Sequence, residues 1–561
     1  MPRVARSSWL GPFRWVAIGW VVVFWRLGYL SLLDPDEAHY AQLTRELVQQ
    51  GGWLVPLLDG KPFIDKPILF HWLQGFSMLL LGETELAARL PSAIAALALF
   101  GVTRWVGRAL FGAAVGEWGA IMFATIPATF ALSFVATFDM VFATFLFWGL
   151  GCLLVASTER RPRLEWCGYG LLTLAVMTKG PVALVLVGLF IVAARLVPGE
   201  TREQMKWLHW KTGLLAVAIA ASPWFLWMSW RFGIEFVRGY TLAGNLWYFT
   251  QPAEFSGRAV HHAFYARTFA GAFFPWSLIV SGRAIDVVRS LRIGRPIKSG
   301  ETLLWLWVLV VIGFFSLARF KLDHYIFPAA PACCLLAAHA WRLAAEDADG
   351  WLRGTRFSVV AVAAVLILAG AFGSVVLFEL DLELPRIAIA FPLALAMGGI
   401  ALTVQTARRH WAVPPNAAVV AVTLLAAYAI VVAVGFPAFE RTRPTAHVAT
   451  RLKQLSAVSA PVGLYRLERW HASLRYYIGR PVDRLETPEE VRAFLAQPQQ
   501  VYTVMFLHDY LDLRKQGTSI HLVIERRAVV GTKGRGVRRQ RWGSLVVATN
   551  IGSDYGRASN R

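Results

Sequence analysis

Carboxylates and a lysine gather in a short stretch that follows the first apolar run of the chain. The segment Asp34-Pro35-Asp36-Glu37-Ala38-His39-Tyr40 is followed by Asp65-Lys66-Pro67. Charges at the edge of a bilayer cost free energy unless they are solvated or used, so this stretch is either a functional site or a polar loop after a helix. A carboxylate can orient or deprotonate a nucleophile, and an ammonium can stabilise charge on a leaving group. The residue types therefore suit acid–base and phosphate chemistry.

The composition identifies the class of protein that must position these groups. Hydrophobic residues make up 56% of the 561 residues and charged residues 16%, whereas soluble domains average about 45–50% and about 25%. The formal net charge of +21 comes mainly from Lys and Arg in short loops between apolar runs. That pattern is typical of membrane topology and of contact with anionic lipid, and it does not indicate nucleic acid. The four cysteines lie in apolar segments and predict no disulfide framework.

The apolar runs predict about thirteen membrane spans, each near the length that crosses a bilayer. Their approximate bounds are 15–33, 86–108, 113–133, 137–157, 164–178, 180–197, 211–230, 265–285, 301–318, 323–344, 356–379, 386–406 and 416–436. Alternate loops are basic, which places the N-terminus in the cytoplasm and the tail outside. We interpret the first run as an uncleaved span because no small-residue cleavage site precedes the acidic segment.

The predicted fold class is therefore mainly α, a polytopic membrane protein with a small α/β domain outside the membrane. We expect a transmembrane domain over residues 1–437 and a soluble domain over residues 438–561. The first outer loop, residues 34–85, should contain helices near 36–50 and 68–81, the second lying in the membrane interface. In the tail, β-branched and aromatic runs predict strands at 462–465, 501–506, 521–524 and 544–547. Thr487-Pro-Glu-Glu490 is typical of a helix start.

Several motifs on the outer side follow one another in a fixed order. They are Asp36-Glu37-Ala38-His39-Tyr40, Asp65-Lys66-Pro67, Ala88-Arg89-Leu90-Pro91-Ser92, Asp139-Met140, Met177-Thr178-Lys179-Gly180, Pro223-Trp224 and residues 316–328 (SLARFKLDHYIFP). The ordered set resembles the membrane glycosyltransferases of the GT-C class, in particular the branch that contains the bacterial aminoarabinose (lipid A) transferase and the protein O-mannosyltransferases. The resemblance extends over residues 15–335 approximately.

The resemblance implies a sugar donor carried on a polyprenyl phosphate and an acceptor on the outer side. Asp36 matches the main catalytic carboxylate of the family, and Asp139 a second essential acid. Lys66 matches a lysine that contacts the donor phosphate, Lys179 a basic residue of the cavity, and Tyr325 a tyrosine that lines it. The other candidates for substrate binding are Glu37, Tyr40, Asp65, Arg258 and Arg267.

The residues themselves leave alternatives open for these roles. Asp36 and Tyr40 are four apart and share one face of the predicted helix. Asp139 could instead be the N-cap of the fourth span. Lys66 and Lys179 could simply extend their ammonium groups to the interface.

The chain also departs from the family pattern. Its relatives usually have Arg where this chain has His39, Glu where it has Asp65, and Pro-Thr where it has Asp323-His324. A Glu-His pair of the large outer loop, whose histidine binds a metal in the resembling enzyme, appears here as Gly244-Asn245. No cofactor is therefore certain. A divalent metal stays open, with Asp65, His261 and His262 as weak candidate ligands.

The expected function is a multi-pass glycosyltransferase of the bacterial inner membrane, acting as a monomer, with its active site in the periplasm. Its partners would be the lipid-linked donor, membrane lipids and an acceptor that is lipid A or another glycolipid or glycan. An O-mannosyltransferase-like enzyme with a protein acceptor is the alternative. A transporter or flippase of lipid-linked sugars would place ionisable residues near the midplane and show internal repeats. A third hypothesis is a structural membrane protein in which only the tail is functional.

Overall fold

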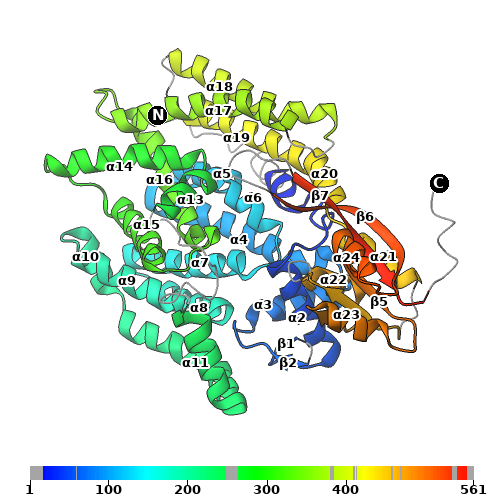
Figure 1. Cartoon of the computed structure of the whole chain (residues 1–561). Coiled ribbons are helices and arrows are strands. Elements are labelled where there is room, and N and C mark those ends of the chain that lie inside the picture. Colours follow the sequence, from blue (N-terminus) through cyan, green and yellow to red (C-terminus); the bar gives the residue numbers. More distant parts are fainter. Residues whose placement is uncertain are drawn as a thin grey trace.

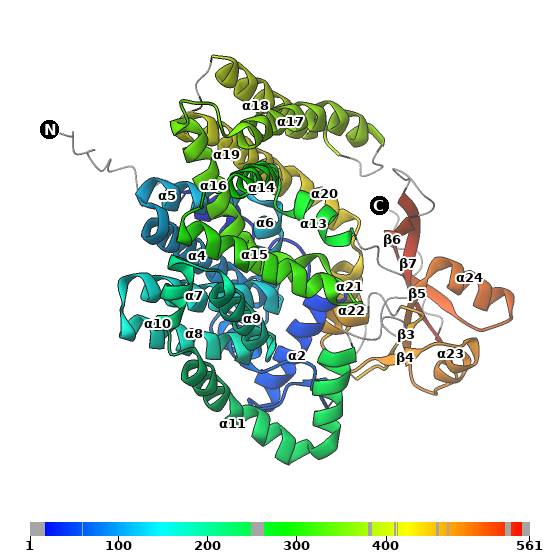
Figure 2. The same cartoon turned by 90° about the vertical axis from the view of Figure 1, so that its left-hand side faces the viewer.

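The computed structural model describes residues 17–551 apart from 59, 248–262, 380–383, 409–410, 412, 456–458, 468–470 and 533–539. Helices dominate the described residues between 17 and 455, and a small sheet with its own helices follows them (Figures 1 and 2). The mainly helical fold class predicted from composition is therefore confirmed.

Eight helices in the described part of the chain are long and apolar enough to cross a membrane. They are Glu85–Phe111 (α4), Phe138–Glu159 (α7), Trp210–Thr241 (α11 and part of η2), Ser299–Leu317 (α15), Asp323–Glu346 (η3 and α16), Arg353–Leu377 (in α17), Arg386–Ala407 (η4 and α18) and Pro415–Arg441 (from α19 to α20). Each one coincides with a predicted apolar run.

Two further runs form bent pairs of helices, and these would bring the number of spans to ten. Ala113–Thr125 (α5) and Pro127–Ser133 (α6) meet at 64°, and Phe264–Ala272 (α13) and Trp276–Arg292 (α14) at 118°. The first bend has a clear cause: Pro127 forces the residue before it out of helical geometry, and Ile126 is extended at φ −73° and ψ 144°.

The other three predicted runs contain shorter or less apolar helices. These are Trp20–Phe24 (η1), Pro162–Lys179 (α8) and Val182–Leu196 (α9). The count of thirteen spans therefore stays a prediction. A small helix, Glu200–Trp207 (α10), connects α9 to α11.

The first outer loop contains the two predicted helices. Asp36–Gln50 (α2) ends at Gly51, whose φ of 71° lies in the left-handed region that glycine adopts without strain. A two-residue hairpin follows, with Leu57–Leu58 (β1) paired to Lys61–Pro62 (β2). Leu69–Leu81 (α3) then packs against α2 and α4. Its side chains Phe76, Leu79 and Leu80 are exposed, as expected for a helix in the membrane interface.

The C-terminal region begins with Phe436–Arg441 (α20) and Thr445–Leu455 (α21). Its five strands are Val462–Tyr465 (β3), Asp483–Leu485 (β4), Tyr502–Phe506 (β5), His521–Thr532 (β6) and Gln540–Thr549 (β7), in the sheet order β4-β3-β5-β7-β6. The strands β4, β3 and β5 are parallel, and β7 and β6 continue the sheet antiparallel.

The helices of this region are His471–Ile478 (α22), Pro488–Leu495 (α23) and Leu507–Lys515 (α24). The predicted helix start at Thr487 is correct: its side chain accepts from the Glu490 N–H, and Glu490 completes a capping box. β4 and α22 were not predicted, and β6 and β7 are longer than expected. The expected domain boundary at 437/438 falls within α20, and it stays a prediction.

Candidate active site

Groups from four parts of the chain meet at one end of the helix bundle. They come from the start of α2, from the loop between β2 and α3, from the adjoining ends of α7 and α8, and from Asp323–Ala329 (η3). Tyr40 marks the centre of this group. Burial raises its pKa well above the ordinary value, and the charges of Asp36, Asp65 and Asp139 raise it further. Three of the predicted carboxylates therefore lie around one phenol.

Close helix packing places Asp139 beside Lys179. Asp139 lies in the first turn of α7, and Lys179 is the last residue of α8. The two helices approach closely through glycines, since a Cβ on Gly149 would lie 3.0 Å from the carbonyl oxygen of Gly168. Lys179 Nζ donates a hydrogen bond to Asp139 Oδ1. The N-cap of α7 is Thr137, so Asp139 is not the cap, and its carboxylate pairs with an ammonium.

The start of η3 lies beside the Asp139–Lys179 pair. The ammonium of Lys179 lies 4.9 Å from the centroid of the Tyr325 ring, a cation–π distance. His324 Nε2 lies 3.6 Å from Asp139 Oδ2. The motif at 316–328 therefore lies beside the Asp139–Lys179 pair through Tyr325, and also through His324, which in the sequence is only a departure from the family pattern.

Lys66 and Asp65 form a second pair of opposite charges. Lys66 Nζ lies 2.9 Å from Asp65 Oδ2, and both side chains are partly exposed, at 18% and 30%. The side chain of Tyr40 packs edge-on against Phe138 at 4.6 Å between ring centroids, which connects α2 to the start of α7. The side chains of Lys66 and Lys179 are both mostly buried, and each keeps a small part exposed to solvent.

Asp36 differs from the other carboxylates of the site. It is the first residue of α2 and is exposed. No hydrogen bond or ion pair engages its carboxylate among the residues that the structure describes. Its oxygens are consequently available to a substrate, and its position depends on the backbone that carries it.

Glu37, which was expected among the substrate-binding residues, lies in the protein interior instead. Its side chain is 0% exposed, and its oxygens accept from Arg89 Nε at 2.7 Å and Arg89 Nη2 at 2.9 Å. It also accepts from the backbone N–H groups of Leu33 and Ala136. Through these hydrogen bonds Glu37 connects α2 to α4 and to the chain before α7.

The remaining candidates are Arg267, Arg258, His261 and His262, of which the structure describes Arg267. Arg267 is an exposed residue of α13, with its guanidinium 5.7 Å from the centroid of the Phe264 ring. Arg258, His261 and His262 lie outside the described residues. No group of three His, Cys, Asp or Glu side chains within the described ranges could hold a metal ion, so a metal stays an open prediction.

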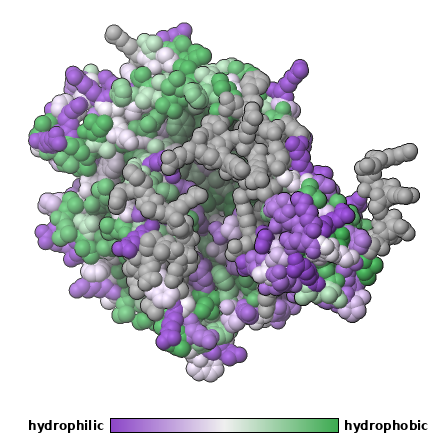
Figure 3. Space-filling view, viewed as in Figure 1, coloured by the Kyte–Doolittle hydropathy of each residue, from purple (hydrophilic) through white to green (hydrophobic). Residues whose placement is uncertain are grey.

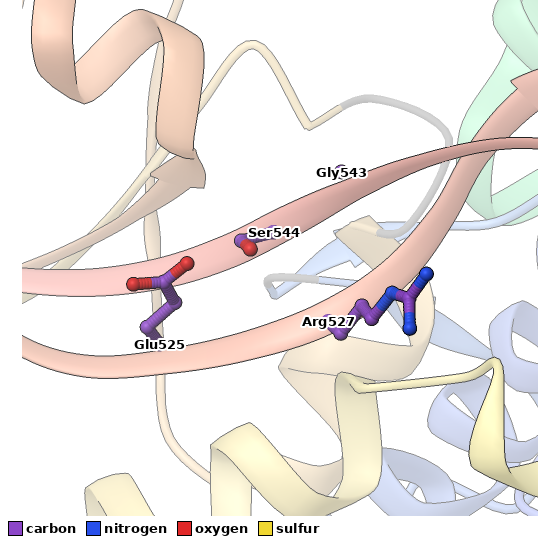
Figure 4. A pocket seen from close by; sticks show the side chains of 4 residues that line it. All are labelled: Glu525, Arg527, Gly543 and Ser544. Carbon is purple, nitrogen blue, oxygen red and sulfur yellow. The ribbon is translucent and has the colours of Figure 1, made fainter.

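A hollow at the surface of the C-terminal region is lined by other residues than this group. It has a volume of about 540 Å³ and is lined by Glu525, Arg527, Gly543 and Ser544 on the β6–β7 hairpin (Figure 4). Hydrophilic residues cover much of the C-terminal region around it, whereas hydrophobic ones are exposed over the helices (Figure 3). None of the predicted site residues lines this hollow.

Comparison with known proteins agrees with the resemblance found in the sequence. The family model described as dolichyl-phosphate-mannose-protein mannosyltransferase matches residues 65–227, a range that includes Lys66, Asp139 and Lys179. The undecaprenyl phosphate-alpha-4-amino-4-deoxy-L-arabinose arabinosyl transferase 1 of Sodalis glossinidius is 29% identical over 378 residues, which are 63% of this chain and 65% of that protein. The match therefore spans less than two thirds of that relative.

The likeness in fold extends over almost the whole chain. The crystal structure of ArnT from Cupriavidus metallidurans bound to undecaprenyl phosphate covers 97% of this chain and 98% of its own, with a TM-score of 0.73 and 22% sequence identity. An oligosaccharyltransferase from Archaeoglobus fulgidus is more distant, with a TM-score of 0.50. The chain is thus similar in part of its sequence to the aminoarabinosyl transferases and to the protein mannosyltransferase model, and it shares the fold of the ArnT structure.

Proposed function

We propose that this protein is an inner-membrane enzyme that moves a sugar from a polyprenyl phosphate to an acceptor on the outer side of the membrane. The observation that carries the proposal is that Asp36, Asp65 and Asp139 all lie near Tyr40, with Lys66 paired to Asp65 and Lys179 to Asp139. These groups come from separate parts of the chain, and together they supply a base and two cations.

The reaction needs a bond to form at the anomeric carbon as the bond to phosphate breaks. The acceptor oxygen attacks that carbon, its proton passes to Asp36, and the electron pair of the broken bond remains on the phosphate. In this proposal Lys66 and Lys179 stabilise that charge, a contribution of about 2–4 kcal/mol for a preorganised donor. Asp139 keeps Lys179 in position. A single displacement of this kind inverts the anomeric carbon.

The acceptor belongs to the same proposal. Lipid A or another glycolipid or glycan is the first candidate, because the curated relatives are aminoarabinosyl transferases. A protein acceptor is the alternative, supported by the match to the mannosyltransferase model. If the acceptor group were a phosphate, it would need no base, and Asp36 would only position it.

A comparison of envelopes tests donor and acceptor class together. Lipid A, glycolipids and envelope proteins from cells with and without the gene would be analysed by mass. A difference of one pentosamine or one hexose on a single class would identify both. The purified protein in liposomes should then make the same product from that sugar on undecaprenyl phosphate. Envelopes of identical mass, together with no transfer in liposomes, would contradict the proposal.

The same liposomes distinguish an enzyme from a flippase. A flippase would move the lipid-linked sugar between leaflets without forming a new glycosidic bond. In this chain, the charged groups of the site gather at the ends of helices rather than near mid-span, which favours the enzyme.

A further inference from the structure

The segment just before Asp36 is held by a helix from the far end of the chain. Asp34 Oδ1 accepts from the backbone N–H of Ser473 at 2.8 Å, and the Ser473 hydroxyl donates to Asp34 Oδ2. Ser473 is the third residue of α22, where the backbone N–H has no partner within its own helix. Asp34 thus caps α22 as an N-cap side chain would, although 439 residues separate the two.

Tyr477, one turn further along α22, makes a second connection. Its hydroxyl accepts from the Leu32 N–H at 2.7 Å and donates to Glu85 Oε1 at 2.8 Å. Glu85 is the first residue of α4. One phenol therefore ties the segment before Asp36 both to the C-terminal region and to a membrane-spanning helix.

The chain around these two contacts is fixed in the same way. The Ser31 N–H donates to Glu440 at 3.0 Å, and Arg443 donates to the carbonyl oxygens of Ser31 and Leu32. Both backbone polar groups of Ser31 and of Leu32 are therefore bonded to residues beyond 439. Deeper along α2, Arg475 Nη2 lies 2.6 Å from Glu46 Oε1, between side chains that are 7% and 8% exposed.

We propose that α22 is a positioning element of the active site, and that Ser473 and Tyr477 set the place of the Asp36 carboxylate. This inference rests on the proposed function. Asp36 depends on its backbone for its position, and that backbone continues from the residues that α22 holds. A displacement of about 1 Å at a reacting group can cost about 10²-fold in rate. Neither Ser473 nor Tyr477 contacts a reacting atom in this mechanism.

Substitutions in α22 that spare its helix test the proposal in the full-length protein. Ser473→Ala removes the hydroxyl and raises helix propensity, so α22 should persist. We expect at least a tenfold lower kcat for transfer, with the KM for the undecaprenyl-phosphate sugar within twofold of wild type. Ser473→Thr keeps both donors and should restore kcat to within about threefold. If Ser473→Ala keeps wild-type kcat just as Ser473→Thr does, the proposal is wrong.

Tyr477→Phe has a matched control in the same region. The hydroxyl of Tyr502 donates to the Leu455 carbonyl oxygen at 3.3 Å, a contact between two C-terminal residues. Tyr477→Phe should lower kcat at least tenfold, while Tyr502→Phe should leave it within twofold. Equal losses in the two variants would mean that the tyrosines only stabilise the C-terminal region, and would overturn the proposal. The double variant Asp34→Ala/Ser473→Ala should lose no more kcat than Asp34→Ala alone, because Ser473→Ala removes a hydrogen bond that Asp34→Ala already abolishes.

Hydrogen exchange separates this inference from the proposed function. The Leu32 amide loses its acceptor in Tyr477→Phe, so its exchange should become at least tenfold faster than in wild type or Tyr502→Phe. Faster exchange with unchanged kcat would show that α22 holds the segment without positioning Asp36, which contradicts the proposal. If wild type transfers no sugar, the proposed function fails, and the exchange of Leu32 alone decides whether α22 holds this segment.

Discussion

At the scale of single residues, the proposed mechanism depends most on Asp36 and Lys66. Asp36→Asn keeps the shape of the side chain and removes its charge, so transfer should fall by about 10²–10⁴-fold, the usual contribution of a general base. Lys66→Ala should also remove most activity because the leaving phosphate loses a cation. Initial rates in liposomes measure both effects.

Lys61→Ala is the matched control, because Lys61 is an exposed lysine of the preceding hairpin. It should transfer at the wild-type rate. Each variant should insert and elute as wild type does in gel filtration. Near-normal transfer by Asp36→Asn or by Lys66→Ala would exclude the proposed mechanism.

The residue types of the site could be predicted because ionisable groups are rare in apolar sequence, and those that occur there stand out. Their pairing could not be predicted. Asp139 and Lys179 are 40 residues apart, and nothing in either span encodes the contact. The burial of Glu37 could not be predicted either. Glu37 is adjacent to Asp36 in sequence, but successive helical residues point about 100° apart. Asp36 is therefore exposed, whereas Glu37 is buried against Arg89.

At the scale of elements, the buried Arg89–Glu37 pair joins α2 to α4. Arg89→Met would leave the Glu37 carboxylate buried without its cation, at a cost of about 3–5 kcal/mol. We expect a clearly lower unfolding temperature in detergent, measured by tryptophan fluorescence. Adding Glu37→Gln to Arg89→Met should recover part of the loss, because the unpaired charge is removed.

The Arg104–Glu117 pair supplies the comparison. Arg104 Nη2 lies 2.5 Å from Glu117 Oε1, but the arginine side chain is 37% exposed, and exposed pairs contribute about 0–1 kcal/mol. Arg104→Met should therefore change the unfolding temperature little. Similar shifts for the two arginine variants would mean that the buried pair does not have the structural role described here.

Hydropathy located the elements well but not their directions. The helices predicted at 36–50 and 68–81 are confirmed as α2 and α3. Their bounds could be predicted because polar residues separate each helix from the next apolar run. The 118° turn between α13 and α14 was not foreseen, since average apolarity contains no information on the direction of a bend. The helix α22 was not foreseen either, because its eight residues have no strong local pattern and the helix depends on contacts with α2.

At the scale of the whole molecule, the positions of the basic residues predict which end of the helix bundle faces the periplasm. The antiparallel helices α7 and α8 have Asp139 and Lys179 at one end, and Arg160 and Arg163 at the other. Basic loops stay in the cytoplasm, so the site and the C-terminal region should face the periplasm. This orientation is a proposal.

A membrane-impermeant thiol reagent tests it in intact cells. In a background with Cys167→Ser, cysteines replacing exposed Lys61 and Lys515 should be labelled from outside. Cysteines replacing exposed Arg163 and Arg202 should be labelled only after the membrane is opened. Labelling of the second pair in intact cells would reverse the proposed topology.

The cap that Asp34 provides for α22 has a consequence for synthesis of the protein. Chains are made from the N-terminus at about 5–20 residues per second, so Ser473 follows Asp34 out of the ribosome by roughly 20–90 s. During that interval the segment before Asp36 lacks the contacts that hold it. An unfinished or truncated chain thus carries every candidate catalytic residue and lacks the element that arranges them. Under the proposed function, such a chain would transfer no sugar until translation and export of the last residues are complete.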